Sequence, residues 1–229
     1  MADTPSVLIL GIGNLLWADE GFGVRAVEEL HRGWSFPDNV RLMDGGTQGI
    51  YLVQHIREAD ILVVFDAVDF GLAPGSLKLA EGDEVPKFLG VKKISLHQTG
   101  FQEVLAMAEM LGDAPAEQLL IGVQPVELDD YGGSLRPEVK AQIAPAIEVA
   151  LDYLARRGIT ARRRAQPLDD DITIASSEMS LARYEAGRPD AAAALRQGDA
   201  RVLTAEGWRG PEDFEAEIDQ LLSQPARPR

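Results

Sequence analysis

Short, continuous apolar runs alternate with longer amphipathic segments along the first 160 residues of the chain. Runs such as residues 7–10 and 61–65 are bounded by Gly, Pro or Asp, and they have the length of strands buried on both faces of a sheet. The intervening segments repeat apolar side chains at intervals of three and four, which is typical of amphipathic helices. The pattern predicts strands at 7–10, 40–43, 61–65, 75–79 and 119–123, and helices at 21–30, 49–56, 97–111 and 137–156.

This alternation of strands and helices implies crossover connections, which make neighbouring strands parallel and place helices on both faces of the sheet. We therefore expect an α/β fold, a three-layer αβα sandwich with a mostly parallel central sheet, followed by a C-terminal appendage. The strand predicted at 75–79 is expected at an edge of the sheet. The last core helix is expected to end at Gly158, so the layered core is complete by about residue 160.

The pattern changes after this last core helix. Three arginines at 162–164 and three aspartates at 169–171 predict a hinge between two parts of the chain. We expect an α/β domain over residues 1–164 and an acidic, partly helical C-terminal extension over residues 165–229, to which the sequence assigns no role. The short helices expected in the extension lie at 180–186, after Pro189 and after Pro211.

Charge and composition exclude several classes of function. The chain has 229 residues and a formal net charge of −15, with 24 acidic and 15 basic residues in 1–164 and 13 and 7 in 165–229. Such acidity disfavours nucleic acids and anionic membranes as partners. Because there is no cysteine and there are three histidines, thiol nucleophiles, Fe–S clusters, disulfides and a His-rich metal cage are excluded. Neither a signal peptide nor a membrane-spanning run is recognisable, so we expect a cytoplasmic protein.

Polar side chains gather where the predicted strands end. The carboxyl ends of parallel strands meet at one edge of a sheet, where α/β proteins bind their ligands, so we expect these side chains to lie close together. Glu20, Asp66 and His97 offer two oxygens and one imidazole nitrogen to a divalent metal, with coordination positions left open. Asp66 ends an apolar run, where a carboxylate is costly unless it is used. The residues at this edge are Gly11, Gly13, Asn14, Asp19, Glu20, Asp44, Gly45, Gly46, Thr47, Asp66 and His97.

Ordinary structural roles compete with this interpretation. Gly11 and Gly13 are typical of a tight turn after a strand. Asp19 is expected to cap the N-terminus of the following helix, and Glu20 is a first-turn acid that the helix dipole favours. Asp44, which precedes two glycines, is typical of a turn. The spacing of the residues alone does not choose between these roles and a metal site.

Two enzyme classes that use glycine-rich turns fit poorly. The dinucleotide fingerprint requires a third glycine for close helix–strand packing, and this chain has Leu16 in its place. The G-x-S-x-G elbow of serine hydrolases is absent from the sequence. A nucleotide-binding α/β enzyme therefore stays a less favoured alternative, and it would need the turn at 11–14 free to cradle phosphate.

Four motifs in order give the sequence a resemblance to a known family. They are LGIGNLLWADEGFGV at 10–24, DGGT at 44–47, FDA at 65–67 and ISLHQ at 94–98, and the similarity continues through LIGVQP at 120–125 to about residue 160. The chain resembles the [NiFe]-hydrogenase maturation endopeptidases. This resemblance implies an αβα sandwich and a peptidase that removes a C-terminal peptide from a hydrogenase large-subunit precursor after nickel insertion.

The resemblance also implies roles for individual residues. It assigns Glu20, Asp66 and His97 to nickel binding, and Asp44 to substrate recognition or to the cleavage step. The candidate catalytic residues are therefore Asp44, Glu20 and Asp66. The nickel is expected to be presented by the precursor rather than held permanently, and hydrogenase accessory chaperones are further expected partners. An incomplete ligand set suits this role, because thiolates of the substrate can complete it only when nickel is present.

The chemistry of cleavage is left open by the sequence. A metal can polarise the scissile carbonyl and acidify a water molecule. Alternatively, a carboxylate acts as general base and nickel serves only for docking. A non-catalytic, nickel-dependent checkpoint or chaperone that binds the precursor without cutting it is the alternative function.

Overall fold

The computed structural model describes residues 4–85, 96–169, 171–172, 174 and 176–188, and for residues 96–100 it describes the backbone alone. These residues belong to one compact unit, Met1–Arg188. Within the described part of the chain, no helix is both long and apolar enough to cross a bilayer.

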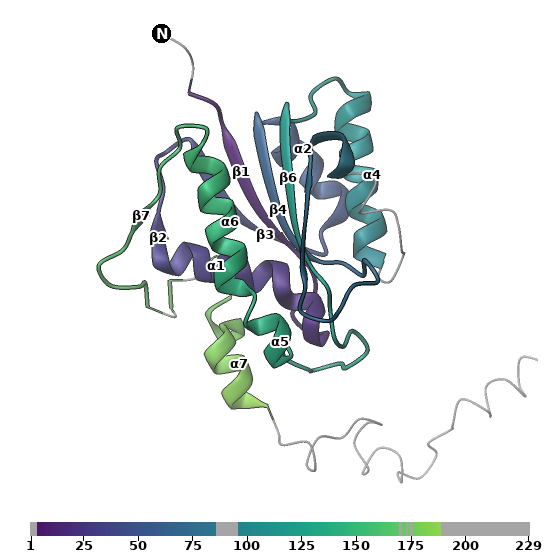
Figure 1. The fold of residues 1–229 in the computed structure, drawn as a ribbon, viewed down its shortest axis with the longest axis vertical. Helices are drawn as coiled ribbons and strands as arrows, with labels where there is room; N and C mark the ends of the chain where they lie inside the picture. Colours follow the sequence, from purple (N-terminus) through teal and green to yellow (C-terminus); the bar gives the residue numbers. More distant parts are fainter. Residues whose placement is uncertain (1–3, 86–95, 170, 173, 175, 189–229) are drawn as a thin grey trace, which may run out of the picture. The chain divides into compact units, whose positions relative to one another are not determined.

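A five-stranded sheet forms the centre of this unit (Figure 1), with strand order β3-β1-β4-β6-β5. The pairs β1–β3, β1–β4 and β4–β6 are parallel, and β5 runs antiparallel to β6 at the edge. This confirms the expected mostly parallel sheet and its edge strand. The strands are β1 (Val7–Ile12), β3 (Val40–Gly46), β4 (Ile61–Ala67), β5 (Leu77–Glu81) and β6 (Glu117–Val123).

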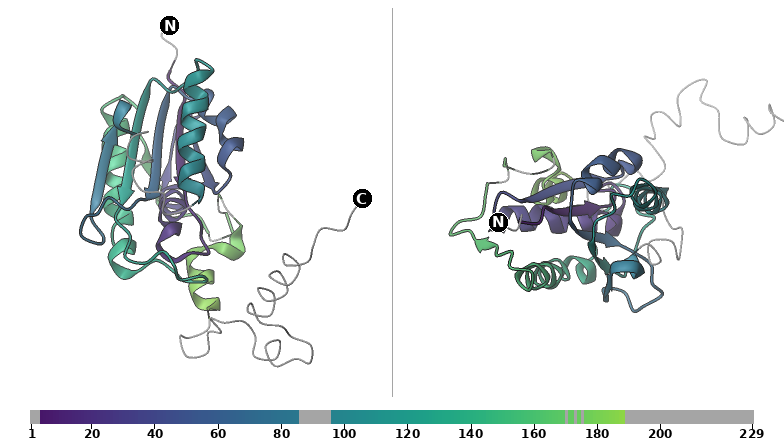
Figure 2. Two further views of the ribbon diagram at one scale, coloured as in Figure 1. Left: turned by 90° about the vertical axis from the view of Figure 1, so that its right-hand side faces the viewer. Right: turned by 90° about the horizontal axis from the view of Figure 1, so that it is seen from above.

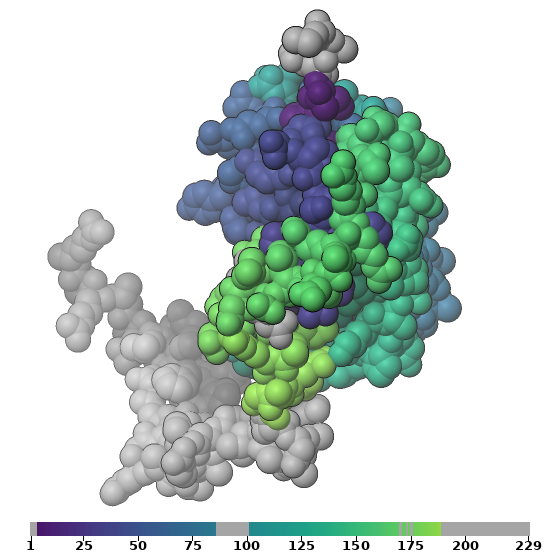
Figure 3. Space-filling model, turned by 90° about the vertical axis from the view of Figure 1, so that its left-hand side faces the viewer, coloured from purple at the N-terminus to yellow at the C-terminus, as the bar shows by residue number. Residues whose placement is uncertain are grey.

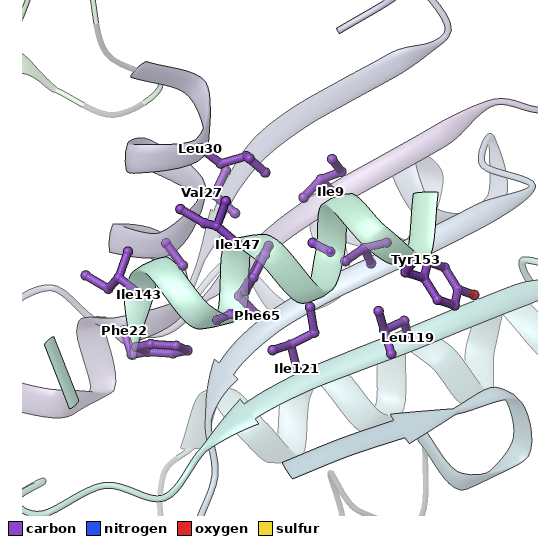
Figure 4. Close-up of a cluster of buried hydrophobic side chains, with 14 of the residues drawn as sticks. Ile9, Phe22, Val27, Leu30, Phe65, Leu119, Ile121, Ile143, Ile147 and Tyr153 are labelled. Carbon is purple, nitrogen blue, oxygen red and sulfur yellow. The ribbon is translucent and has the colours of Figure 1, made fainter. Parts of the chain in front are cut away.

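Helices cover both faces of the sheet, so the three-layer fold class is confirmed (Figure 2). One face packs on α1 (Phe22–Gly33) and α6 (Ile143–Ala155), and Figure 4 shows the apolar side chains between them and the strands. The other face packs on α4 and on the helical segment that follows β3. The other helical elements of the described residues are η1 (Ala18–Gly21), η2 (Gly49–Leu52), α2 (Val53–Arg57), η3 (Gly82–Glu84), α4 (Leu96–Met110), α5 (Pro137–Lys140), η4 (Ser177–Met179) and α7 (Leu181–Gly187).

The two cores follow from the alternation of side chains along each strand. In β1, Val7 and Ile9 belong to the core under α1 and α6, whereas Leu8 and Leu10 belong to the core under α2 and α4. All four are at most 3% exposed. Because successive side chains of a strand point to opposite faces, a run that is apolar at every position can fill two cores at once.

Two predicted helices are divided in the structure. The helix expected at 137–156 is broken into α5 and α6, and Pro145 lies in the first turn of α6. A proline has no N–H to donate to the carbonyl four residues earlier, and its ring clashes with that carbonyl, so one continuous helix cannot pass through it. The helix expected at 49–56 begins as the 3₁₀ segment η2 and continues as α2.

A short antiparallel ribbon was not predicted by the pattern. It pairs β2 (Trp34–Ser35) with β7 (Arg162–Arg163), and the Arg163 guanidinium lies 5.9 Å from the centre of the Trp34 ring. Two of the arginines in the predicted hinge are therefore paired with the segment that follows α1. Two-residue strands are too short to leave a periodic signal in the sequence.

The helix predicted near 180–186 forms as α7 and packs back on the α/β layers (Figure 3). The Tyr184 hydroxyl donates to the carbonyl of Gly133 at 3.2 Å, and Glu185 forms an ion pair of 2.8 Å with Lys140 of α5. The compact unit thus continues beyond residue 164, and the expected two-domain division at that point stays a prediction. The helices expected after Pro189 and Pro211 lie outside the described residues.

Candidate active site

Asp44 and Asp66 lie at the carboxyl edge of the sheet, among the last residues of β3 and β4 rather than after these strands. Asp44 is level with Gly11 of the central strand β1, and Asp66 pairs with Gly122 of β6. Strand β1 lies between β3 and β4, so the two backbones are separated by about 10 Å, two strand spacings. The sheet therefore brings both aspartates to one edge, as expected from the sequence.

The two aspartates nevertheless face opposite layers. Asp44 is paired with Gly11, whose Cα faces the backbone of Gly23 in α1. Asp66 follows Phe65, which belongs to the α1–α6 core, so its side chain points to the other face, toward the layer of α2 and α4. The three candidate catalytic carboxylates therefore do not form a single cluster.

Glu20 lies close enough to Asp66 for its charge to act on that carboxylate, and it has no such effect on Asp44. Asp66 is completely buried, and this burial, together with the nearby charge of Glu20, raises its pKa well above 3.8, although the backbone N–H of Ala67 opposes the shift. Burial, assisted by the charge of Asp129, raises the pKa of Glu20 from 4.5 to about 7. Two carboxylates that both resist ionisation at close range are typical of a site that receives a cation.

His97 lies in the first turn of α4, in the layer toward which Asp66 points. Its side chain is outside the part of the structure that is described, so its approach to Glu20 and Asp66 stays a prediction. Among the side chains that are described, no group of three or more His, Asp or Glu residues is arranged to hold a metal ion. The described pair could offer two oxygen ligands, and with the imidazole of His97 the donor set would fit a divalent metal such as nickel.

Asp19 does not cap a helix, so that expectation is wrong. The residue is inside η1, fully buried, and its carboxylate accepts three backbone N–H groups from the segment after β6. Two of these bonds come from Val126 and Glu127 at 2.8 Å, and the third comes from Arg136 at 2.7 Å. A buried carboxylate with several N–H partners is well satisfied. Asp19 therefore fastens the β6–α5 loop, which carries Asp129, against η1 beside Glu20.

The glycines of the first motif serve close backbone packing. A Cβ on Gly13, whose φ is +136°, would lie 1.8 Å from the carbonyl oxygen of Glu20. A Cβ on Gly23 would lie 2.1 Å from the carbonyl oxygen of Phe65. The expected tight turn is thus present, and it is filled by the protein's own backbone. The N–H of Gly13 donates to the carbonyl of Gly46 at 3.1 Å, so it is not available to a phosphate as a nucleotide-binding enzyme would require.

Asp44 has separate surroundings on the α1 side. Burial raises its pKa, opposed by the backbone N–H of Gly46 and by Arg25. Its Oδ1 atom is buried without a hydrogen-bond partner among the described residues. Arg25, 3% exposed, pairs with Glu28 at 2.8 Å and also donates to the carbonyl of Met179. A cavity of about 490 Å³ adjoins Arg25 and Glu28, between α1, α5 and α7.

Sequence reasoning missed two residues that shape these surroundings. Asp129 belongs to an acidic run that follows β6, so the same strand-end rule that selected Asp66 points to it as well. Arg25 is a charged residue within the buried, otherwise apolar stretch of α1, and a charge within an apolar helical stripe was the available signal. Neither residue belongs to a recognisable local motif.

Comparisons with known proteins point in one direction. The model of the HycI hydrogenase maturation protease family matches residues 24–153. The hydrogenase expression/formation protein HupD of Thiocapsa roseopersicina is 64% identical over 205 residues, which are 90% of this chain and 93% of that protein. The hydrogenase 2 maturation protease of Escherichia coli is 40% identical over 68% of this chain and 94% of its own length.

A solved structure agrees with the sequence relatives. The hydrogenase maturating endopeptidase HybD from E. coli superimposes with a TM-score of 0.67 at 38% identity, and the match covers 70% of this chain and 98% of that one. The family match includes Asp44, Asp66 and His97 and begins four residues after Glu20. On fold, family model and relatives together, the chain belongs to the hydrogenase maturation proteases, a family of peptidases.

Proposed function

We propose that this chain removes the C-terminal peptide of a [NiFe]-hydrogenase large-subunit precursor once nickel has been inserted, and that it detects the nickel carried by that substrate. The observation that carries the proposal is the pairing of Glu20 with Asp66 at the carboxyl edge of the sheet. Burial raises the pKa of both carboxyl groups because it disfavours their charged forms, and a cation bound between them would stabilise those charged forms. Family membership supplies the reaction class.

The nickel belongs to the substrate in this proposal. Glu20 and Asp66 would each offer an oxygen to it, and His97, at the start of α4, would offer its imidazole. Three protein ligands leave coordination positions for the groups of the precursor that already hold the metal. Binding of the loaded precursor is then stronger than binding of the empty one, which spares unfinished subunits from cleavage.

We assign the cleavage step to Asp44. The sheet separates it from the Glu20–Asp66 pair, so it stays available when that pair is engaged with nickel. Its buried Oδ1 atom has an unused acceptor position, and burial raises the pKa of this carboxyl group above its ordinary value, which makes it a better proton acceptor. Asp44 would accept a proton from the attacking water, and the division of roles favours an aspartyl-type reaction over a metal-activated one.

The decisive experiment compares nickel-loaded and nickel-free precursor, with mass loss and binding measured separately. Wild-type protein should shorten only the loaded precursor. Asp44→Asn should bind the loaded precursor without shortening it, whereas Glu20→Gln and His97→Ala should lose the preference for the loaded form. Asp113→Asn, at an exposed ion pair with Arg57, is the matched control and should behave as wild type.

Each other outcome assigns a different function. Binding of the loaded precursor by the wild type without any mass loss would identify a non-catalytic checkpoint. Cleavage of the nickel-free precursor at the same rate would remove nickel detection from the proposal. A cytoplasmic location and contact with accessory chaperones remain predictions from the sequence.

A further inference from the structure

The loop that Asp19 fastens also forms a surface beside Glu20. Trp17 and Tyr131 form an isolated antiparallel bridge, and the N–H of Gly132 donates to the carbonyl of Leu16 at 2.7 Å. Residues that lie opposite each other in such a bridge place their side chains on the same side. The two rings meet edge to face, with centroids 5.3 Å apart and an interplanar angle of 65°. We call this pair, Trp17 and Tyr131, the aromatic shelf.

The shelf adjoins the candidate site from both of its segments. Trp17 precedes Glu20 by three residues, and Tyr131 follows Asp129, whose charge acts on Glu20, by two. Tyr131 is 68% exposed, although it is a large aromatic residue in contact with another ring. An exposed aromatic side chain held at the border of a reactive site is typical of a contact that anchors a partner.

The protein holds this surface in place at a cost in free energy. Ala18, directly after Trp17, has a φ of +39°, a left-handed conformation that is unfavourable for an L-residue. The next residue, Asp19, is a buried carboxylate whose three hydrogen bonds go to the loop that carries Tyr131. Strained backbone conformations that are held in place by surrounding contacts occur preferentially at functional sites. The two observations independently connect the position of the shelf with the site.

We infer that the aromatic shelf binds an extended segment of the substrate precursor beside Glu20, through an apolar or aromatic side chain of that segment. The inference rests on the proposed function. A protease must receive its target peptide bond in an extended segment, because helices and sheets bury their backbone groups. An edge-to-face pair with one ring exposed offers a flat apolar contact and a phenol hydroxyl to such a segment.

The test is the steady-state cleavage of nickel-loaded large-subunit precursor by full-length variants. Tyr131→Ala should raise KM about 10-fold, equivalent to about 1.4 kcal/mol of binding, with kcat unchanged. Tyr131→Phe keeps the ring and should stay within twofold of the wild-type KM. Met110→Ala removes a side chain that is 87% exposed at the far end of α4 and should leave both constants unchanged.

A second measurement separates binding from catalysis. In the Asp44→Asn background, Tyr131→Ala should weaken the Kd for the loaded precursor by the same factor. If wild type cleaves the precursor and Tyr131→Ala has the wild-type KM, the shelf does not bind substrate. A fall in kcat at constant KM would equally overturn the inference, whereas absence of cleavage by the wild type would refute the proposed function instead.

Discussion

The carboxylate of Asp19 accepts a hydrogen bond of 2.7 Å from the backbone N–H of Arg136, 117 residues further along the chain. This bond joins η1 to the start of α5, and the bonds from Val126 and Glu127 join the same carboxylate to the end of β6. One buried side chain thus fixes both ends of the loop that borders Glu20. Removal of this carboxylate should therefore loosen the loop at residues 126–136, far from residue 19 in the sequence.

Asp19→Asn should destabilise the protein by about 1–3 kcal/mol, because the amide has one acceptor oxygen and sets an NH₂ group against a backbone N–H. Chemical denaturation measures this loss. Limited proteolysis should show new cleavage within 126–136. Glu29→Gln, at an exposed pair with Arg32, is the control and should change stability by less than about 0.5 kcal/mol. Equal stability of Asp19→Asn and wild type would show that the loop is held by other contacts.

Gly23→Ala tests the close crossing of α1 over the sheet. The added Cβ would lie 2.1 Å from the carbonyl oxygen of Phe65 and 2.3 Å from that of Ile12, and neither backbone group can move aside as a side chain can. We expect a loss of about 3 kcal/mol or more in the free energy of unfolding, measured by denaturation.

Gly33→Ala provides the matched control in the same helix. A Cβ there meets no atom within 4 Å. Because alanine is the better helix former, this variant should gain up to about 1 kcal/mol. A small effect of Gly23→Ala, similar to that of Gly33→Ala, would mean that α1 can move away from the strands without cost.

The sequence predicted the features that depend on neighbouring residues, such as the buried strands, and missed the contacts between residues far apart in the chain. Uninterrupted apolar runs predicted β1 and β4, because each strand fills two cores. The rule for strand ends located Asp44 and Asp66 but not their opposite directions, which follow from the register of each strand within the sheet. The hydrogen bonds from Arg136 to Asp19 and from Arg25 to Met179 join segments more than 100 residues apart, and no local pattern in the sequence encodes them.

Asp66→Asn should stabilise the protein at neutral and alkaline pH in the absence of metal. The folded protein holds the Asp66 proton to a higher pH than the unfolded chain does, because burial raises the pKa well above 3.8. Between the unfolded and the folded pKa, unfolding releases a proton, so the free energy of unfolding of the wild type falls as pH rises. Asparagine carries no charge and avoids this loss.

The measurement is the free energy of unfolding of wild type and variant from pH 4 to pH 8. The advantage of Asp66→Asn should grow steadily with pH over this range. Glu20→Gln should show the same direction between pH 4.5 and about 7, with a smaller gain because Glu20 is partly exposed to solvent. A pH-independent difference would show that Asp66 is ionised in the folded protein.

Truncation tests whether the segment after residue 164 is part of the folded unit. A chain that ends at Arg164 loses Met179, whose carbonyl accepts from Arg25, and Glu185, which pairs with Lys140. Arg25 is 3% exposed, and a buried charge that loses a partner is strongly unfavourable. In the shortened chain the cavity beside α1 opens to solvent, but water can reach only part of the Arg25 guanidinium. We therefore expect the free energy of unfolding to fall by about 2–4 kcal/mol.

A chain that ends at Arg188 keeps these contacts and is the reference for the truncation. Glu185→Gln in the full chain separates the ion pair from the rest of the segment, and it should cost less than about 1 kcal/mol because the pair with Lys140 is partly exposed. If the chain that ends at Arg164 unfolds at the same denaturant concentration as the one that ends at Arg188, Arg25 is satisfied without the segment after residue 164, and the domain boundary expected at residue 164 is the correct one.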